Sequence, residues 1–152
     1  MPRSALGVVH EFLASPAIAV VGVSANQKKF GAVLYRELKS RGRNVYPVHP
    51  ARPAVDGEHC YPSVTSLPHE VTGVVTVVPP SATERVVDEC ITKGIRSIWM
   101  QQGSSSPEAI RKAEQAGLSV IHGQCLLMFL EPVGSFHRVH RFFRKAFGGY
   151  PR

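Results

Sequence analysis

Apolar residues in this chain occur as short unbroken runs that alternate with stretches where they recur every three or four positions. Residues 18–23 are apolar apart from Gly22, which is typical of a strand buried on both faces of a parallel sheet. Residues 30–41 carry apolar side chains at helical spacing, and Gly42 then ends the helix. The pattern therefore predicts an opening unit of strand, loop and helix.

The same order recurs downstream. We expect strands at residues 44–48, 73–78, 95–100 and 118–121, with a long proline-rich connection over residues 50–68. A second helix is predicted over residues 81–93, where Ser81 and Glu84 match a capping box. A third begins at Ser106, before a first-turn proline, and stops at Gly117. Such alternation predicts an α/β, Rossmann-like three-layer fold with a five-stranded, mostly parallel sheet.

The length of 152 residues is that of one domain. We therefore interpret residues 1–152 as a single domain, with an N-terminal segment at 1–15 and a basic C-terminal helix and tail at 133–152. In that tail, Phe136, Val139, Phe143 and Phe147 fall on one helical face and basic residues on the other. This predicts a C-terminal amphipathic helix.

The positive charge is concentrated in this tail. The net charge is +7, but five of the 18 basic residues and no acidic residue lie within 133–152, which leaves 13 basic against 11 acidic residues elsewhere. The ordinary interpretation is a helix docked on the sheet by its phenylalanines. The alternatives are a membrane surface, a subunit contact in a homodimer, or nucleic acid, for which a few cations without interleaved aromatic residues make no strong case.

Several classes of protein do not fit the sequence. No apolar run approaches the length of a membrane span, and the N-terminus does not resemble an export signal. Cys60, Cys90 and Cys125 stand far apart, with no CxxC and no spacing typical of a metal site. We therefore expect a cytoplasmic protein without a metal.

The loop after the first strand contains the main candidate chemistry. Gly22 permits close backbone approach, Ser24 and Asn26 offer short polar side chains, and Lys28 and Lys29 add positive charge beside the start of a helix. Helix N-termini bind anions, so a diphosphate would be held by amides, dipole and ammonium together. The alternative is a polar surface loop with solvated lysines.

The end of the second strand indicates which nucleotide would fit. The first loop is not GxGxxG, and the acidic residue that binds an NAD ribose is missing. His49 and Pro50 stand there instead, followed by Arg52. This combination favours an adenosine that carries an extra phosphate, which Lys28, Lys29 or Arg52 would sense.

At these positions the sequence resembles small stand-alone CoA-binding proteins, related to the CoA-binding domain of the succinyl-CoA synthetase alpha subunit. The likeness spans about four-fifths of the chain and lies in residues 19–24 (AVVGVS), 45–50 (VYPVHP), 57–63 (GEHCYPS), 99–103 (WMQQG) and Cys125. His49 departs from the asparagine that is commoner in this family, so adenine-side hydrogen bonding is left open.

The resemblance implies a site for coenzyme A or an acyl-CoA. The loop residues Gly22, Val23, Ser24 and Asn26 would meet the diphosphate, with Lys28 or Lys29 assisting. Val48, His49 and Pro50 would flank the adenosine. Pro79, Pro80 and Thr83 would border the cofactor from the third strand, and Gln102 and Gly103 would close the rim or merely form a tight turn.

Binding is expected in preference to catalysis. In the synthetase relatives the phosphorylated histidine lies in other domains, and this chain has no nucleophile elbow, P-loop or HExxH. Cys125, near His122, is either a packed core residue or a thiol that forms a mixed disulfide with CoA. Two other functions stay open: a minimal NAD(P)-binding oxidoreductase, and an interaction protein that uses the basic C-terminal helix.

Overall fold

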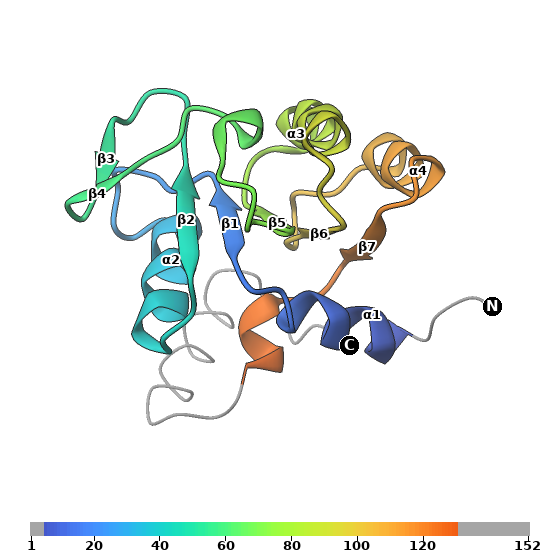
Figure 1. Ribbon diagram of the computed structural model, residues 1–152, viewed down its shortest axis with the longest axis horizontal. Helices are drawn as coiled ribbons and strands as arrows, with labels where there is room; N and C mark the ends of the chain where they lie inside the picture. Colours follow the sequence, from blue (N-terminus) through green and yellow to red (C-terminus); the bar gives the residue numbers. More distant parts are fainter. Residues whose placement is uncertain (1–4, 131–152) are drawn as a thin grey trace.

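The computed structural model describes residues 5–130. Five strands form one sheet in the order β2-β1-β5-β6-β7, and every neighbouring pair is parallel. The strands are β1 (Ile18–Val21), β2 (Val45–Val48), β5 (Gly73–Thr76), β6 (Ser97–Met100) and β7 (Ser119–His122). The predicted α/β fold with a five-stranded parallel sheet is confirmed (Figure 1).

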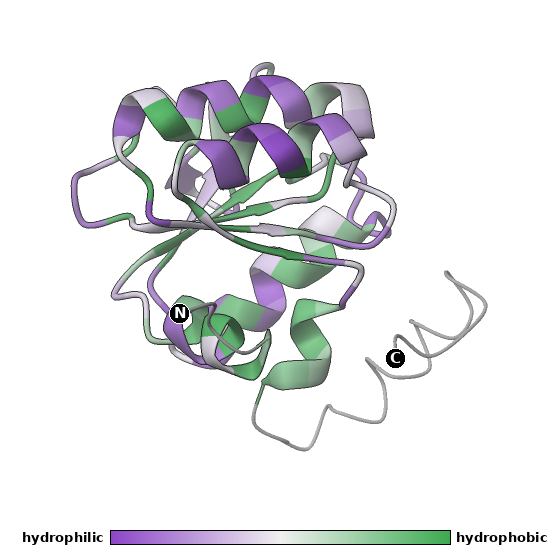
Figure 2. Cartoon of the chain, turned by 90° about the vertical axis from the view of Figure 1, so that its right-hand side faces the viewer, coloured by the Kyte–Doolittle hydropathy of each residue, from purple (hydrophilic) through white to green (hydrophobic). Residues whose placement is uncertain are grey.

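Helices cover both faces of this sheet. Helices α3 (Pro80–Lys93) and α4 (Pro107–Gln115) lie on one face, and α1 (Ala5–Leu13) and α2 (Phe30–Ser40) lie on the other (Figures 1 and 2). Apolar residues concentrate in the strands and the inward sides of the helices, as Figure 2 shows. The three predicted layers are therefore present.

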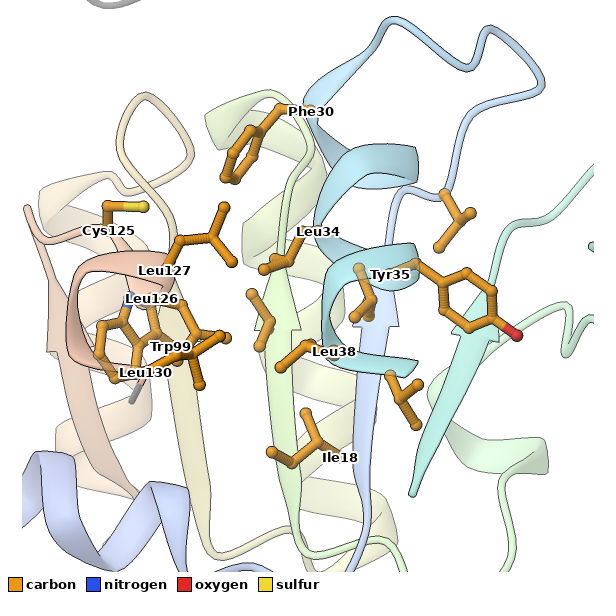
Figure 3. Close-up of a cluster of buried hydrophobic side chains, with 14 of the residues drawn as sticks. Ile18, Phe30, Leu34, Tyr35, Leu38, Trp99, Cys125, Leu126, Leu127 and Leu130 are labelled. Atoms are coloured by element: carbon orange, nitrogen blue, oxygen red, sulfur yellow. The ribbon is translucent and has the colours of Figure 1, made fainter. Parts of the chain in front are cut away.

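Side chains alternate between two apolar clusters along each strand. Val20, Val75 and Trp99 belong to the cluster that packs against α1 and α2, whereas Ala19 and Val74 belong to the cluster beneath α3 and α4. A strand with a period of two and apolar residues on both faces produces this division. Figure 3 shows the first cluster, in which Trp99 lies beside Leu126 and Leu130.

The strand order reverses between β1 and β5. From β1 the chain passes through α2 to β2 on one side, and it then returns to pair β5 with the other side of β1. Val21 is aligned with Thr76 at the carboxyl ends of these two strands. Open parallel sheets bind ligands at such a reversal, so the carboxyl ends of β1 and β5 are the expected ligand site.

Several elements were not predicted from the sequence. The N-terminal segment contains α1, which buries Val9 and Phe12, and the Phe12 ring meets Trp99 edge-on at 5.4 Å between centroids. The proline-rich connection contains an antiparallel pair, β3 (Ala54–Val55) and β4 (Glu58–His59). Two short 3₁₀ turns, η1 (Val64–Ser66) and η2 (Leu126–Phe129), complete the described chain.

One predicted helix start is confirmed and another is wrong. Ser106 caps α4, because its hydroxyl accepts a hydrogen bond from the Ala109 amide at 3.0 Å. The capping box at Ser81 does not form, since α3 already begins at Pro80 and its Glu84 instead accepts a bond from Ser106. Proline at the first helical position has no N–H group, so this helix start has one donor fewer that needs a cap.

The amphipathic helix predicted within residues 133–152 lies outside the described residues. Among the helices of residues 5–130, none has the length and apolar character that a membrane crossing requires.

Candidate functional site

Two neighbouring hollows open at the carboxyl edge of the sheet. The larger, of about 600 Å³, lies where the strand order reverses, and we call it the main hollow. It is lined by the loops after β1, β5 and β6 and by the start of α2, through Gly22, Ser24, Lys29, Phe30, Gly31, Val77, Val78, Pro79, Pro80, Gln102, Gly103 and Ser104.

The smaller one, of about 210 Å³, lies between the end of β2 and helix α3, and we call it the side hollow. Its lining comprises Val21, Val48, Pro50, Pro62, Ser63, Val78, Ala82, Arg85, Val86 and Glu89. Val78 lines both hollows. The two hollows therefore adjoin at Val78.

Two glycines let the backbone come close at the main hollow. Gly22 has φ +106°, and a Cβ there would overlap the Val77 carbonyl oxygen and lie 2.8 Å from Val78 Cγ1. A Cβ on Gly31 would overlap the Gly22 carbonyl oxygen. The end of β1, the start of α2 and the loop after β5 are thus packed together with no space for a side chain.

The loop after β1 is shaped by its own polar side chains. The Ser24 hydroxyl accepts a hydrogen bond from the Asn26 amide, and the Asn26 side-chain oxygen accepts one from the Lys28 amide, both at 3.0 Å. Ser24 also lines the main hollow, where its hydroxyl proton can still be donated, whereas Asn26 is exposed and lines neither hollow. Asn26 therefore shapes the loop.

Lys29 and the start of helix α2 both bring positive charge to the main hollow. Helix α2 begins at Phe30, and Lys29 precedes it without a side-chain cap. The first amides of a helix have no intrahelical acceptor and favour an anion. Lys29 lines the main hollow and Lys28 does not. The structure thus distinguishes between the two predicted lysines.

Arg52 is bound to this loop. Its Nη1 donates to the carbonyl oxygens of Val23 and Ser24, at 3.1 and 3.0 Å. The Val23 side chain is fully buried in the core, so only its backbone takes part in the loop. Arg52 therefore holds the predicted binding loop in place through Nη1.

The end of β2 supplies two of its three predicted residues to the side hollow. Val48 and Pro50 line it, but His49 does not. The His49 ring accepts a hydrogen bond at Nδ1 from the Ala51 amide at 3.0 Å, and the His49 amide donates to Tyr61. His49 thus stabilises the turn beside the hollow.

A buried cluster of three hydroxyl groups joins the loops after β5 and β6. The Ser104 hydroxyl lies 2.9 Å from Thr76 Oγ1 and 2.8 Å from Thr83 Oγ1, and it accepts a bond from the Val78 amide at 3.4 Å. Thr83 is fully buried. Thr83 therefore supports the rim from behind and does not border the hollow as the sequence predicted.

Four further predicted residues line the main hollow, namely Pro79, Pro80, Gln102 and Gly103. Gly103 has φ +82°, which fits a tight turn as well as a rim. The Gln102 side-chain oxygen is buried and has no hydrogen-bond partner among residues 5–130. A buried acceptor without a partner is costly, and because this oxygen is inaccessible, the Gln102 side chain must turn toward the hollow before a ligand can donate to it.

Cys125 is part of the core. Its side chain is fully buried beside Leu127 (Figure 3), and burial raises the pKa of its thiol from 9.0 to about 11. His122 is exposed. These findings favour the packing interpretation, because a thiol that reacts must be accessible and ionised. Disulfide formation with CoA stays a prediction.

Some lining residues were missed by sequence reasoning. Phe30, Gly31 and Val77 flank predicted residues, and their place beside the strand reversal was the available signal. Ser63 and Arg85 reach the side hollow from segments distant in sequence. No local pattern marks such residues, since only the packing of α3 over the sheet brings them to the end of β2.

Comparisons with known proteins match most of this chain. A family model described as CoA binding domain matches residues 16–131. Acetate--CoA ligase [ADP-forming] I of Archaeoglobus fulgidus is 28% identical over 121 residues, which is 73% of this chain and 18% of the ligase. The chain thus spans less than a fifth of the length of that curated relative.

Solved structures show the same fold. A conserved hypothetical protein from Pyrococcus furiosus superposes with a TM-score of 0.73 at 37% identity, covering 75% of this chain and 98% of that one. The apo dinucleotide forming acetyl-coenzyme A synthetase 1 of Ca. Korarchaeum cryptofilum superposes with a TM-score of 0.65 at 30% identity. That match covers 74% of this chain and 27% of the synthetase.

Proposed function

This chain belongs to the CoA-binding domain family, and from that premise we propose that it binds coenzyme A, free or acylated, across the two hollows. The diphosphate lies in the main hollow against Gly22, Ser24 and Lys29, and the adenosine lies in the side hollow against Val48 and Pro50. The pantetheine arm runs past Pro79 and Pro80 toward Gln102.

The observation that carries the proposal is the position of the main hollow. It lies at the reversal of strand order, and it combines a helix start, one lysine and two glycines that bring the end of β1, the start of α2 and the loop after β5 close together. The helix start stabilises a diphosphate through donated amide hydrogens, and the lysine does so through its charge. A surface loop with merely solvated lysines would not need Gly22 and Gly31 to pack without side chains.

The chemistry of the lining fits the rest of the ligand. The pantetheine arm of CoA is a flexible chain with two amide groups, whose N–H bonds need acceptors. The unpartnered side-chain oxygen of Gln102 becomes such an acceptor when the side chain turns toward the hollow, and Val77, Pro79 and Pro80 supply apolar contacts nearby. The side hollow has apolar walls from Val48 and Pro50, which suit a purine.

The function proposed is binding, without a reaction of its own. The ligase activity named for the relatives belongs to proteins of which this chain spans a small part. No described group of three His, Cys, Asp or Glu side chains in residues 5–130 is placed to hold a metal ion. The site supplies donors, charge and shape, which are the requirements of a binding protein.

Titration calorimetry with CoA tests the proposal, with NAD as the second ligand. We expect CoA to bind and NAD to bind at least about tenfold more weakly, because an acidic residue for the NAD ribose is missing. Lys29→Ala should weaken CoA binding about tenfold, since a charge-assisted bond is lost. Lys28→Ala is the matched control and should stay within about twofold.

Two results would contradict this assignment. The absence of measurable heat with CoA at any accessible concentration would remove the function. Tighter binding of NAD than of CoA would instead favour the oxidoreductase interpretation, which uses the same sheet with a different ligand.

A further inference from the structure

We propose that Arg85 is the residue that selects ligands with a phosphate monoester on the adenosine ribose, as CoA has and dephospho-CoA does not. The inference rests on the proposed function, because it assumes that adenosine occupies the side hollow. Arg85 lies on α3 and lines that hollow together with Pro50 and Ser63.

The carboxylates near Arg85 on its own helix all have other partners. Glu84 accepts a hydrogen bond from the Ser106 hydroxyl at 3.3 Å, and Asp88 pairs with Lys112 at 3.1 Å. Glu89, one turn after Arg85, accepts a bond from the Val64 amide at 2.8 Å. Arg85 has no ion pair within the part of the chain that the structure describes.

Glu89 is also the acidic residue among the side-hollow lining. Its bond to Val64 joins α3 to η1 and directs the carboxylate to the backbone, although a Glu four residues after an Arg is well placed to pair with it. Arg85 is exposed, and its guanidinium is thus available to a ligand in the side hollow. Arginine is suited to phosphate because its planar fork donates two parallel hydrogen bonds.

The other cations near the site are used elsewhere. Arg52 donates to two carbonyl oxygens of the loop after β1. Lys29 lines the main hollow and not the side hollow. Lys28 lines neither hollow. The side hollow is where the ribose would lie. Among the described residues, Arg85 is therefore the basic side chain that lines it.

The test is a comparison of two ligands in two variants by titration calorimetry. The wild-type chain should bind CoA about ten- to a hundredfold more tightly than dephospho-CoA. Arg85→Gln should lower the affinity for CoA to near that for dephospho-CoA, while the dephospho-CoA affinity stays within about twofold. Arg85→Lys, which keeps the charge but loses the fork, should give an intermediate ratio.

Lys93→Gln is the matched control, because Lys93 is a basic residue at the end of the same helix and lines neither hollow. Lys93→Gln should leave the ratio of the CoA affinity to the dephospho-CoA affinity unchanged. Equal wild-type affinity for the two ligands, or a ratio that survives Arg85→Gln, would overturn the role of Arg85 while CoA binding stands. If the wild-type chain binds neither ligand, the proposed function fails first, so the two failures are distinguishable.

Discussion

Arg52 Nη1 donates a hydrogen bond to the Ser24 carbonyl oxygen at 3.0 Å, across 28 positions of the sequence. The same atom donates to the carbonyl oxygen of Val23. This pair of bonds fastens the connection after β2 to the loop after β1. Two segments that would meet different parts of one nucleotide are thereby held in a fixed relation before any ligand arrives.

Replacing Arg52 by Met should therefore weaken all ligands of the site alike. Without the guanidinium, the two carbonyl oxygens lose their donor and the loop gains freedom that binding must then remove. We expect affinity for CoA and dephospho-CoA to fall by the same factor, about five- to twentyfold, in calorimetric titrations. A selective loss for CoA would show that Arg52 contacts the ribose phosphate, which contradicts its assignment to the loop.

Gly22→Ala should destabilise the fold as well as the site. The new Cβ would have to fit at φ +106° against Val77 and Val78. We expect the free energy of unfolding to fall by more than about 2 kcal/mol in urea denaturation. Gly42→Ala is the control, with φ +77° but no atom within 4 Å of the new Cβ, and should cost only about 1 kcal/mol. Equal losses would mean that close packing at Gly22 is unimportant.

Ser104→Ala should reveal the contribution of the hydroxyl cluster. The change leaves the Val78 amide without its acceptor and removes the partner of Thr76 and Thr83. The free energy of unfolding should fall by about 1–3 kcal/mol, as measured by thermal or urea unfolding. Ser81→Ala, at an exposed serine that does not cap α3, should stay within about 0.5 kcal/mol. If Ser81→Ala lowers the free energy of unfolding as much as Ser104→Ala does, Ser81 caps α3 after all, as the sequence predicted.

Because of Cys125, the free energy of unfolding should fall at alkaline pH. Because burial raises its thiol pKa from 9.0 to about 11, the folded chain keeps the proton over a range in which the unfolded chain loses it. The contribution is intact below pH 9 and is lost as pH rises from 9 to about 11, by up to about 2.7 kcal/mol. Cys125→Ala should therefore flatten the pH dependence of unfolding in that range. An unchanged slope would contradict the pKa assignment.

The same burial predicts the outcome of a thiol reaction. Folded protein incubated with oxidised CoA should show no mass increase on Cys125, whereas protein unfolded in denaturant should be modified. Intact-mass measurement with peptide mapping distinguishes the two. An adduct on Cys125 in the folded chain would support the mixed-disulfide hypothesis and would require the core around Leu127 to open.

Much of the framework follows from the sequence because apolar runs and turn residues are local signals. The strand at residues 18–21, its glycine and the helix beginning at Phe30 are each specified within a few positions. Order along the chain then implies parallel pairing, and parallel pairing brings the loops after β1, β5 and β6 to one edge. Gly22, Lys29 and Gln102 are brought together in this way.

What the sequence did not reveal depends on contacts between distant segments. Helix α1 is short, and its Phe12 is buried by contacts with distant residues, among them the Trp99 ring and the backbone at Gly73. Lys28 and Lys29 look equivalent in the sequence, but the helix start turns only one of them into the main hollow. Thr83 and Arg85 lie on one helix two residues apart, and packing decides that the first is buried and the second lines the side hollow.

In the proposed complex the diphosphate of CoA lies against the loop between β1 and α2. An NMR titration of ¹⁵N-labelled protein with CoA, which follows assigned backbone amides, tests this position. The amide signals of Gly22, Ser24 and Gly31 should shift saturably with one affinity, while that of Gly117, which lines neither hollow, should not move. If saturating CoA shifts other signals and leaves those of Gly22 and Ser24 in place, the ligand binds elsewhere and the proposed site is wrong.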